Sequence, residues 1–90
     1  MYQVKYTKQF EKDLRLCMKR GYDLNLFRDV ASILAQEGKL PSIYYPHKLS
    51  GKYKDRWECH IKSDWLLVWK QNDEELVLLF TNTGTHSDLF

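Results

Sequence analysis

Histidine is the residue type in this chain best suited to proton transfer at neutral pH, and the chain holds three, His47, His60 and His86. The unperturbed pKa of an imidazole is about 6.5, so one histidine can accept a proton while another donates one. A carboxylate, Asp64, lies between the second and third histidines in the sequence and can orient an imidazole. These four residues form the predicted catalytic set.

Cleavage of RNA is a reaction that such a set can catalyse without a metal ion. The ribose 2′-hydroxyl attacks the neighbouring phosphate if a general base takes its proton and a general acid protonates the leaving 5′-oxygen. Positive charge must stabilise the phosphorane, and an aromatic ring can stack on a base, a contact worth roughly 1–3 kcal/mol. The candidate stacking residues are Trp65 and Phe90. The candidate phosphate ligands are Lys48, Lys52, Lys54 and Arg56.

Each of these residues also has a purely structural interpretation. His47 lies among basic residues and can be a surface histidine, His60 can satisfy a local hydrogen bond in a strand, and Asp64 can begin a turn. The three tryptophans, taken singly, are typical core residues. The segment 86–88 holds residue types of a hydrolase triad, but adjacent residues rarely reach triad geometry. A zinc site of the three histidines and Asp64 is a further alternative, although their spacing matches no compact ligand motif.

Composition predicts one domain over residues 1–90, because a chain of this length can bury a single modest core. Its 43% hydrophobic and 29% charged residues exclude a disordered class. The apolar runs are far shorter than the ~20 residues that span a bilayer, and the first residues lack the apolar segment of a secretory signal. We therefore expect a cytoplasmic protein with no membrane partner. Cys17 and Cys59 are expected to be small buried apolar residues.

Charge is distributed unevenly along the chain, although the net charge is only +2. Residues 47–62 contain five Lys or Arg and two Asp or Glu, whereas residues 71–90 contain four acidic residues and no Lys or Arg. A basic segment beside the histidines suits a ligand that carries phosphate. A solvated surface explains the same charges equally well.

Apolar periodicity predicts a strand followed by two helices in the first half of the chain. Residues 2–6 alternate apolar and polar side chains, as in a half-buried strand. Thr7 can cap a first helix that ends near Gly21, and Asp23 can cap a second helix that ends at Gly38. Their short connection predicts an antiparallel helix pair.

The second half of the chain predicts a long connection and three strands. Residues 39–55 are polar, aromatic and rich in turn-forming residues, and long ordered loops are usually functional. Strand patterns follow at 56–61, 65–70 and 75–81, and their short connections require antiparallel neighbours. The expected fold is α+β, in the order β-α-α-β-β-β, with a two-helix hairpin packed on a small antiparallel sheet.

Three segments, taken together and in order, resemble one protein family. They read H-x-L-x-G at 47–51, H-x-x-x-D at 60–64 and G-T-H-x-x-L-F at 84–90. The chain resembles the YafQ branch of the RelE/ParE superfamily of toxins from bacterial type II toxin–antitoxin modules. The resemblance covers nearly the whole chain, including its length and its order of elements.

The resemblance implies a ribosome-dependent endoribonuclease that cuts translated mRNA and inhibits translation, with no cofactor. By similarity, His47 would be the general base and His86 the general acid. His60 and Asp64 would bind and orient within the site, and Phe90 would position a base. The implied partners are a cognate antitoxin, the ribosome and mRNA, with DNA reached only through the antitoxin complex.

Asn82 is the main departure from the pattern of this branch, which commonly has an arginine four residues before the last histidine. Asparagine donates hydrogen bonds but cannot neutralise a phosphorane, and arginine is the side chain best matched to phosphate. We expect Arg56, at the start of the strand that carries His60, to supply the missing charge. The alternative is a weak or inactive module of the same fold that binds RNA, ribosome or antitoxin without cleavage.

Overall fold

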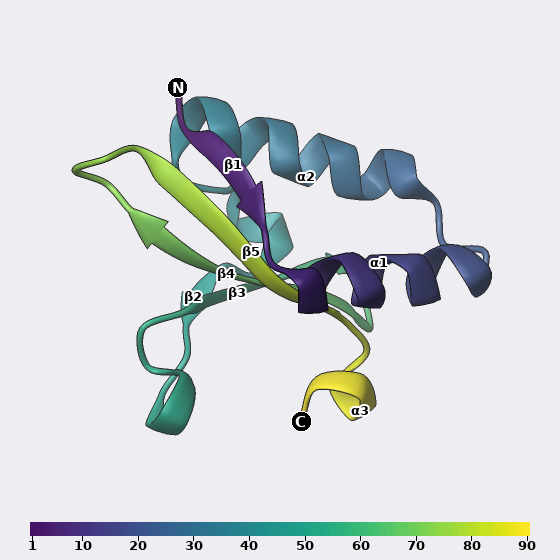
Figure 1. The fold of residues 1–90 in the computed structure, drawn as a ribbon. Helices are drawn as coiled ribbons and strands as arrows, with labels where there is room; N and C mark the ends of the chain where they lie inside the picture. Colours follow the sequence, from purple (N-terminus) through teal and green to yellow (C-terminus); the bar gives the residue numbers. More distant parts are fainter.

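The computed structural model describes all residues 1–90 as an α+β fold, in which α1 and α2 lie on one side of a sheet and the short α3 lies on the other (Figure 1). The helices are α1 (Lys8–Lys19), α2 (Leu24–Glu37) and α3 (His86–Leu89), with short 3-10 turns η1 (Ser42–Tyr44) and η2 (Gly51–Tyr53). The strands are β1 (Gln3–Tyr6), β2 (His47–Lys48), β3 (Trp57–Lys62), β4 (Trp65–Asn72) and β5 (Val77–Gly84). None of the helices combines the length and apolar character needed to cross a bilayer.

The sheet has five strands in the spatial order β1-β5-β4-β3-β2. Strands β2 to β5 pair antiparallel, as predicted from their short connections. Strand β1 pairs parallel with β5, so the sheet is mixed, and the expectation of a wholly antiparallel sheet was wrong. No tight turn joins β1 to β5, so no local signal fixes their relative direction. Strand β2 and helix α3 are additional short elements, and β2 lies within the predicted long connection.

The predicted ends of the two long helices are confirmed. The Thr7 hydroxyl accepts a hydrogen bond from the backbone of Phe10 at 3.0 Å, and the Asp23 carboxylate accepts one from an early α2 amide. Helix α2 ends at Gly38, whose φ of 69° is left-handed. A Cβ at Gly38 would lie 2.5 Å from the ring of Tyr2, so this position requires glycine for space as well as for backbone conformation.

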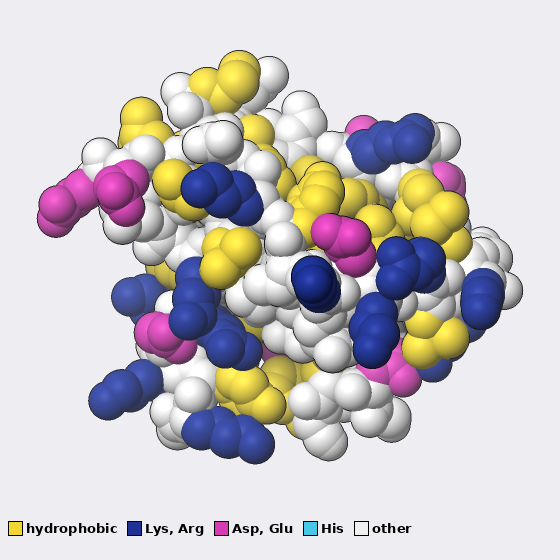
Figure 2. Space-filling view, in the orientation of Figure 1, with side chains coloured by type: hydrophobic (Ala, Val, Ile, Leu, Met, Phe, Trp, Pro, Cys, Tyr) yellow, Lys and Arg dark blue, Asp and Glu magenta, His cyan; other side chains and the backbone are white.

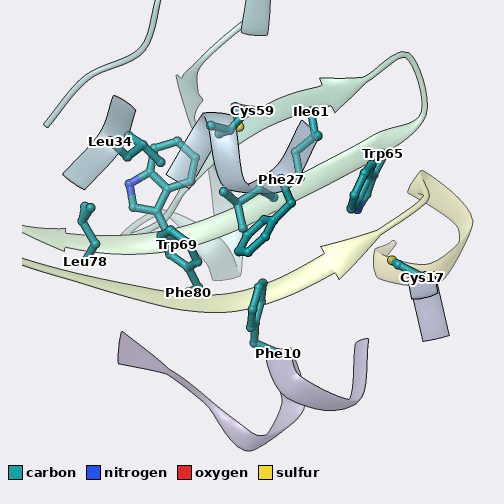
Figure 3. Close-up of a cluster of buried hydrophobic side chains, with 12 residues drawn as sticks. Phe10, Cys17, Phe27, Leu34, Cys59, Ile61, Trp65, Trp69, Leu78 and Phe80 are labelled. Carbon is teal, nitrogen blue, oxygen red and sulfur yellow. The ribbon is translucent and has the colours of Figure 1, made fainter. Parts of the chain in front are cut away.

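The core lies between the sheet and the two long helices, and aromatic side chains fill its centre (Figure 3). Phe10 from α1, Phe27 from α2 and Phe80 from β5 contact one another with ring centroids 5.6, 5.7 and 5.9 Å apart. Trp69 and Leu34 extend this cluster along β4 and α2. Full burial of such side chains stabilises the fold by about 1.5–3 kcal/mol each, so this layer fixes how the helices sit on the sheet.

Candidate active site

Strand pairing places the candidate residues in two rows on the side of the sheet that faces away from α1 and α2. Directly paired residues project to the same side of a sheet. The first row, from β2 to β5, is His47, Glu58, Val68 and Asn82. The second row, from β3 to β5, is His60, Leu66 and Gly84. We call this side of the sheet the site face.

His86 joins the site face because α3 begins immediately after β5. Its ring nitrogen Nδ1 lies 2.8 Å from Asp64 Oδ1, and its backbone N–H donates to the same oxygen at 3.1 Å. These hydrogen bonds from His86 hold the pKa of the Asp64 carboxyl below its usual value. An ionised Asp64 only accepts, so Nδ1 of His86 carries a hydrogen and Nε2 is left to exchange a proton with a substrate.

Glu58 is a buried carboxylate on the site face, and sequence reasoning missed it. It is 4% exposed, its Oε1 lies 3.2 Å from His47 Nε2, and its Oε2 has no hydrogen-bond partner. A buried carboxylate beside an imidazole is a typical functional arrangement. The available signal was its position two residues before His60 in a strand, since residues two apart share one side.

His47 is held from its other ring nitrogen by a backbone carbonyl. Its Nδ1 lies 2.9 Å from the carbonyl oxygen of Tyr45. A carbonyl oxygen only accepts, so Nδ1 carries a hydrogen and Nε2 is the nitrogen presented to Glu58. The ring is therefore fixed from both sides, although its side chain is 48% exposed.

His60 lies between the two imidazole–carboxylate pairs. Its Nδ1 lies 3.3 Å from the Ser63 carbonyl oxygen, and its ring centroid lies 5.7 Å from that of His86. Glu58, His60 and His86 each offer one ligand atom, and these atoms all lie within 4.8 Å of one another. Of the predicted set of three histidines and Asp64, only His60 and His86 belong to the group that could hold a metal ion, and Glu58 is its third member.

Helix α3 is also held in place by a second carboxylate, that of Asp88. Thr85 caps α3, and its backbone N–H donates to Asp88 at 2.8 Å in a capping box. Arg20, at the end of α1, donates two hydrogen bonds to Asp88 at 2.6 and 3.0 Å. These bonds hold the pKa of Asp88 well below its usual range. A Cβ at Gly84 would lie 2.7 Å from Asp88 Oδ2, so the glycine also makes room for this contact.

The two predicted stacking residues occupy different environments. Trp65 is 3% exposed, packs against Tyr22 at a centroid distance of 4.9 Å and donates from its indole to Thr83 at 2.9 Å. This burial contradicts the predicted role of Trp65 as an open platform and makes it a core residue. Phe90 is 59% exposed and contacts Tyr53 edge to face at 5.7 Å, so its ring remains accessible to a ligand.

Arg56 and Asn82 line one cavity of about 300 Å³, together with Lys70. The guanidinium of Arg56 lies 5.3 Å from the centroid of the Tyr53 ring, and its Nε is buried with no hydrogen-bond partner. Lys70 pairs with Asp55 at 3.3 Å, which lowers the pKa of that carboxyl. The structure therefore brings a cation to the neighbourhood of Asn82, as the hypothesis about Arg56 requires.

The three candidate lysines lie near one another in sequence but present their charges differently. Lys48 pairs with Trp57 and so projects away from the site face, with Nζ 5.8 Å from that ring. Lys52 covers the ring of Tyr53 at 5.2 Å, and Lys54 is exposed at the end of η2. Figure 2 shows Lys and Arg side chains over the lower left of the molecule. The acidic β4–β5 turn lies away from them and projects at the left.

A fold of this order, with a histidine and carboxylate site opposite the helices, defines a toxin of the RelE type. Comparison with known proteins supports this class. A family model described as bacterial toxin of type II toxin-antitoxin system, YafQ, matches residues 2–90. The mRNA interferase toxin YafQ of Escherichia coli K12 is 35% identical over 88 residues, covering 97% of this chain and 94% of that protein. The chain therefore belongs to the YafQ family of toxins, and the expected resemblance is confirmed.

Two solved structures extend the comparison. The E. coli DinJ–YafQ complex contains a chain that is 34% identical, with a TM-score of 0.89, covering 100% of this chain and 99% of that one. A metal-bound toxin from Helicobacter pylori is 41% identical, with a TM-score of 0.90 and 100% coverage of both chains. The α+β fold with two helices on a five-stranded mixed sheet is common to this family.

We expect the Arg20–Asp88 contact to make stability depend on pH in acid. The folded-state pKa of Asp88 is depressed, so its contribution is fully present above the unfolded pKa of about 3.9 and is lost as the pH falls through the folded value. Asp88→Asn should lower the urea midpoint at pH 7, and the difference from wild type should shrink below about pH 4. Asp29→Asn, at an exposed carboxylate of α2, is the control. A difference that stays constant from pH 7 to pH 2 would contradict this account.

Proposed function

We propose that this mRNA interferase cuts translated mRNA on the ribosome by metal-independent attack of a ribose 2′-hydroxyl on the adjacent phosphate. The observation that carries the proposal is the presence of two imidazole–carboxylate pairs, His47 with Glu58 and His86 with Asp64, on one face of the sheet. In-line displacement needs one group to remove a proton and another to deliver one. The products would be a 2′,3′-cyclic phosphate and a free 5′-hydroxyl.

His86 is suited to be the general acid. Asp64 accepts a hydrogen bond from Nδ1 of His86, so a proton on Nε2 can pass to the 5′-oxygen as the P–O bond breaks. The carboxylate also holds the imidazole in one orientation, with Nε2 directed away from Asp64. His86 is 55% exposed on its side chain, which leaves Nε2 accessible to RNA.

His47 and Glu58 are suited to act together as the general base. Because Tyr45 fixes a hydrogen on Nδ1, only Nε2 of His47 can accept the proton of the 2′-hydroxyl. That nitrogen also faces Glu58, so Glu58 would hold the proton of this pair, and Nε2 would accept from the 2′-hydroxyl once the substrate replaces Glu58 at that nitrogen. His60, beside both pairs, would contact the substrate and help to align it.

Positive charge for the phosphorane would come from Arg56, with Asn82 donating a hydrogen bond. Both residues line the same cavity, and Asn82 also borders the pocket formed with Phe90. The side chain of Arg56 is 26% exposed, so part of it can be reached by RNA. Lys52, Lys54 and Lys70 would contribute charge to the RNA backbone around this position.

Dependence on the ribosome follows from the modest charge of the chain. A net charge of +2 provides few phosphate contacts, and affinity built on such contacts falls steeply with salt. The ribosome would hold the message and present one phosphate to the site face. The isolated protein should therefore cut free RNA poorly.

A cognate antitoxin is the proposed protein partner. A chain very similar to this one is seen in the E. coli DinJ–YafQ complex, so the fold is compatible with binding an antitoxin. An antitoxin that covered the site face would exclude RNA and stop cleavage. DNA would be contacted only through such a complex.

Replacing either proton-transfer histidine should abolish cleavage while the fold survives. His47→Ala and His86→Ala are each expected to lower the cleavage rate of a message on programmed ribosomes by 10²-fold or more. Primer extension measures the cuts, and thermal unfolding of each variant checks the fold. Undiminished cutting by either variant would exclude that residue from proton transfer. A folded wild-type chain that makes no cuts would instead favour the module that binds without cleavage.

Arg56→Ala should reduce cleavage by removing the charge that replaces the family arginine. Because the lost interaction is charge-assisted, a reduction of about tenfold or more is expected, with partial retention in Arg56→Lys. Adding Asn82→Arg to Arg56→Ala should restore cutting, since an arginine at 82 enters the same cavity. If Arg56→Ala cuts ribosome-bound message as fast as wild type, Arg56 is not the substitute.

Binding of a transition-metal ion is a second candidate function, favoured by the cluster of Glu58, His60 and His86. Two imidazoles and a carboxylate suit Zn²⁺ or Cu²⁺, and the H. pylori toxin of the same fold is metal-bound. A metal on His86 would occupy the nitrogen needed for proton donation. Bound metal and acid catalysis by His86 therefore exclude each other.

Chelation separates the two functions. Protein that has been stripped of transition metals with EDTA, and then freed of the chelator because ribosomes require Mg²⁺, should still cleave message on ribosomes. Added Zn²⁺ should inhibit this cleavage, and Glu58→Gln should weaken Zn²⁺ binding measured by calorimetry. Loss of cleavage by the stripped protein, with recovery on adding Zn²⁺, would contradict metal independence and indicate a metal hydrolase.

A further inference from the structure

Tyr45 contacts two of the three histidines, through two different parts of the residue. Its carbonyl oxygen lies 2.9 Å from His47 Nδ1, and its ring approaches the ring of His60 edge to face with centroids 5.6 Å apart. The same tyrosine is 68% exposed, so most of its ring faces solvent. The side chain is thus held against the site without being buried in it.

The backbone of Tyr45 is in a conformation that a tyrosine seldom adopts. Its φ and ψ are 49° and 50°, in the left-handed region, and its N–H closes η1 on the Ser42 carbonyl at 2.9 Å. Non-glycine residues in this region are strained and concentrate at functional sites. Here the conformation turns the carbonyl oxygen toward His47. A glycine would make the same turn without strain, so the tyrosine side chain must be explained separately.

An exposed aromatic ring beside the reacting groups suits a nucleobase. The base is attached to the ribose whose 2′-oxygen attacks, so a ring that binds it must lie next to the histidines. Trp65 cannot offer such a ring because it is 3% exposed, and Phe90 contacts Tyr53 instead of a histidine. Stacking on tyrosine tolerates any base, as a nuclease acting on many messages requires.

We propose that the Tyr45 ring stacks on a base of the nucleotides flanking the cut, while its left-handed carbonyl sets the orientation of His47. The inference rests on the proposed RNA cleavage and adds a base-binding residue to that site. Tyr45 is a binding residue through its ring and a positioning residue through its backbone. The two functions can be separated, because different substitutions remove one or the other.

The role of the ring is tested by measuring the Kd of the protein for programmed ribosomes. The message on these ribosomes carries a 2′-deoxynucleotide at the cut position, so it cannot be cut. Tyr45→Gly keeps the left-handed backbone and removes the ring, so Kd should rise about tenfold. Tyr45→Phe should restore most of the lost affinity. Ile43→Ala is the matched control: Ile43 lies two residues earlier, is 72% exposed and has no aromatic ring to stack on a base.

The backbone is tested by comparing Tyr45→Val with Tyr45→Gly in cleavage of the normal message. Both lack the ring and should bind equally, but valine disfavours a positive φ and should turn the carbonyl away from His47. The kcat of Tyr45→Val should fall about tenfold below that of Tyr45→Gly, with KM the same in both. Thermal unfolding confirms that each variant is folded.

The outcomes distinguish this inference from the function on which it rests. If the wild-type chain cuts the message but Tyr45→Gly binds it as tightly as wild type, the stacking role is overturned. If Tyr45→Val and Tyr45→Gly have equal kcat, the positioning role is overturned. A wild-type chain that neither binds nor cuts the message would overturn the proposed function and this inference with it. Weaker binding by Tyr45→Gly, recovered in Tyr45→Phe and absent in Ile43→Ala, supports the stacking role.

Discussion

The alternation of side chains across β3, β4 and β5 is the constraint on which the rest of the structure depends. One set of side chains, including Trp69 and Phe80, is buried under α1 and α2 and supplies most of the hydrophobic stabilisation. The strand register that buries these side chains also fixes which side chains lie on the opposite side of the sheet, because a slip of one residue would exchange the two sides. Glu58 and His60 therefore lie on the site face as a consequence of core packing. A chain of this size can in this way carry a polar site directly on the back of its only large core.

The C-terminal segment meets this sheet through polar contacts rather than through hydrophobic burial. Helix α3 has only four residues and no buried side chain, so it cannot hold its own position. Arg20 from α1 and the Thr85 cap converge on Asp88, and Asp64 receives His86 from the other side. The end of helix α1 thus fixes, from the opposite side of the sheet, the helix that begins with His86. This arrangement explains why the site is assembled from segments as far apart as residues 20 and 88.

Local signals in the sequence were sufficient for the parts of the fold that depend on neighbouring residues. Thr7 and Asp23 begin the two long helices and Gly38 ends the second, as predicted, because caps and left-handed glycines act within one turn. The parallel pairing of β1 and the contact of Glu58 with His47 were not predicted, because each depends on a residue distant in sequence or on the final register. The burial of Trp65 under Tyr22 agrees with its interpretation as a core residue and not with its predicted role as a stacking platform. The left-handed conformation of Tyr45 had no signal either, because glycine or asparagine usually marks such a turn.

The proposed mechanism uses the substrate's own 2′-hydroxyl as the nucleophile, and the protein supplies only proton transfer, charge and alignment. It is tested most directly by placing a single 2′-deoxynucleotide at a mapped cut position of a message on programmed ribosomes. Wild-type protein should no longer cut at the modified position, should still cut at unmodified positions, and should leave a 2′,3′-cyclic phosphate at the unmodified positions. Continued cutting at the deoxynucleotide would show that another nucleophile, such as water, attacks the phosphate, and would exclude the 2′-hydroxyl mechanism.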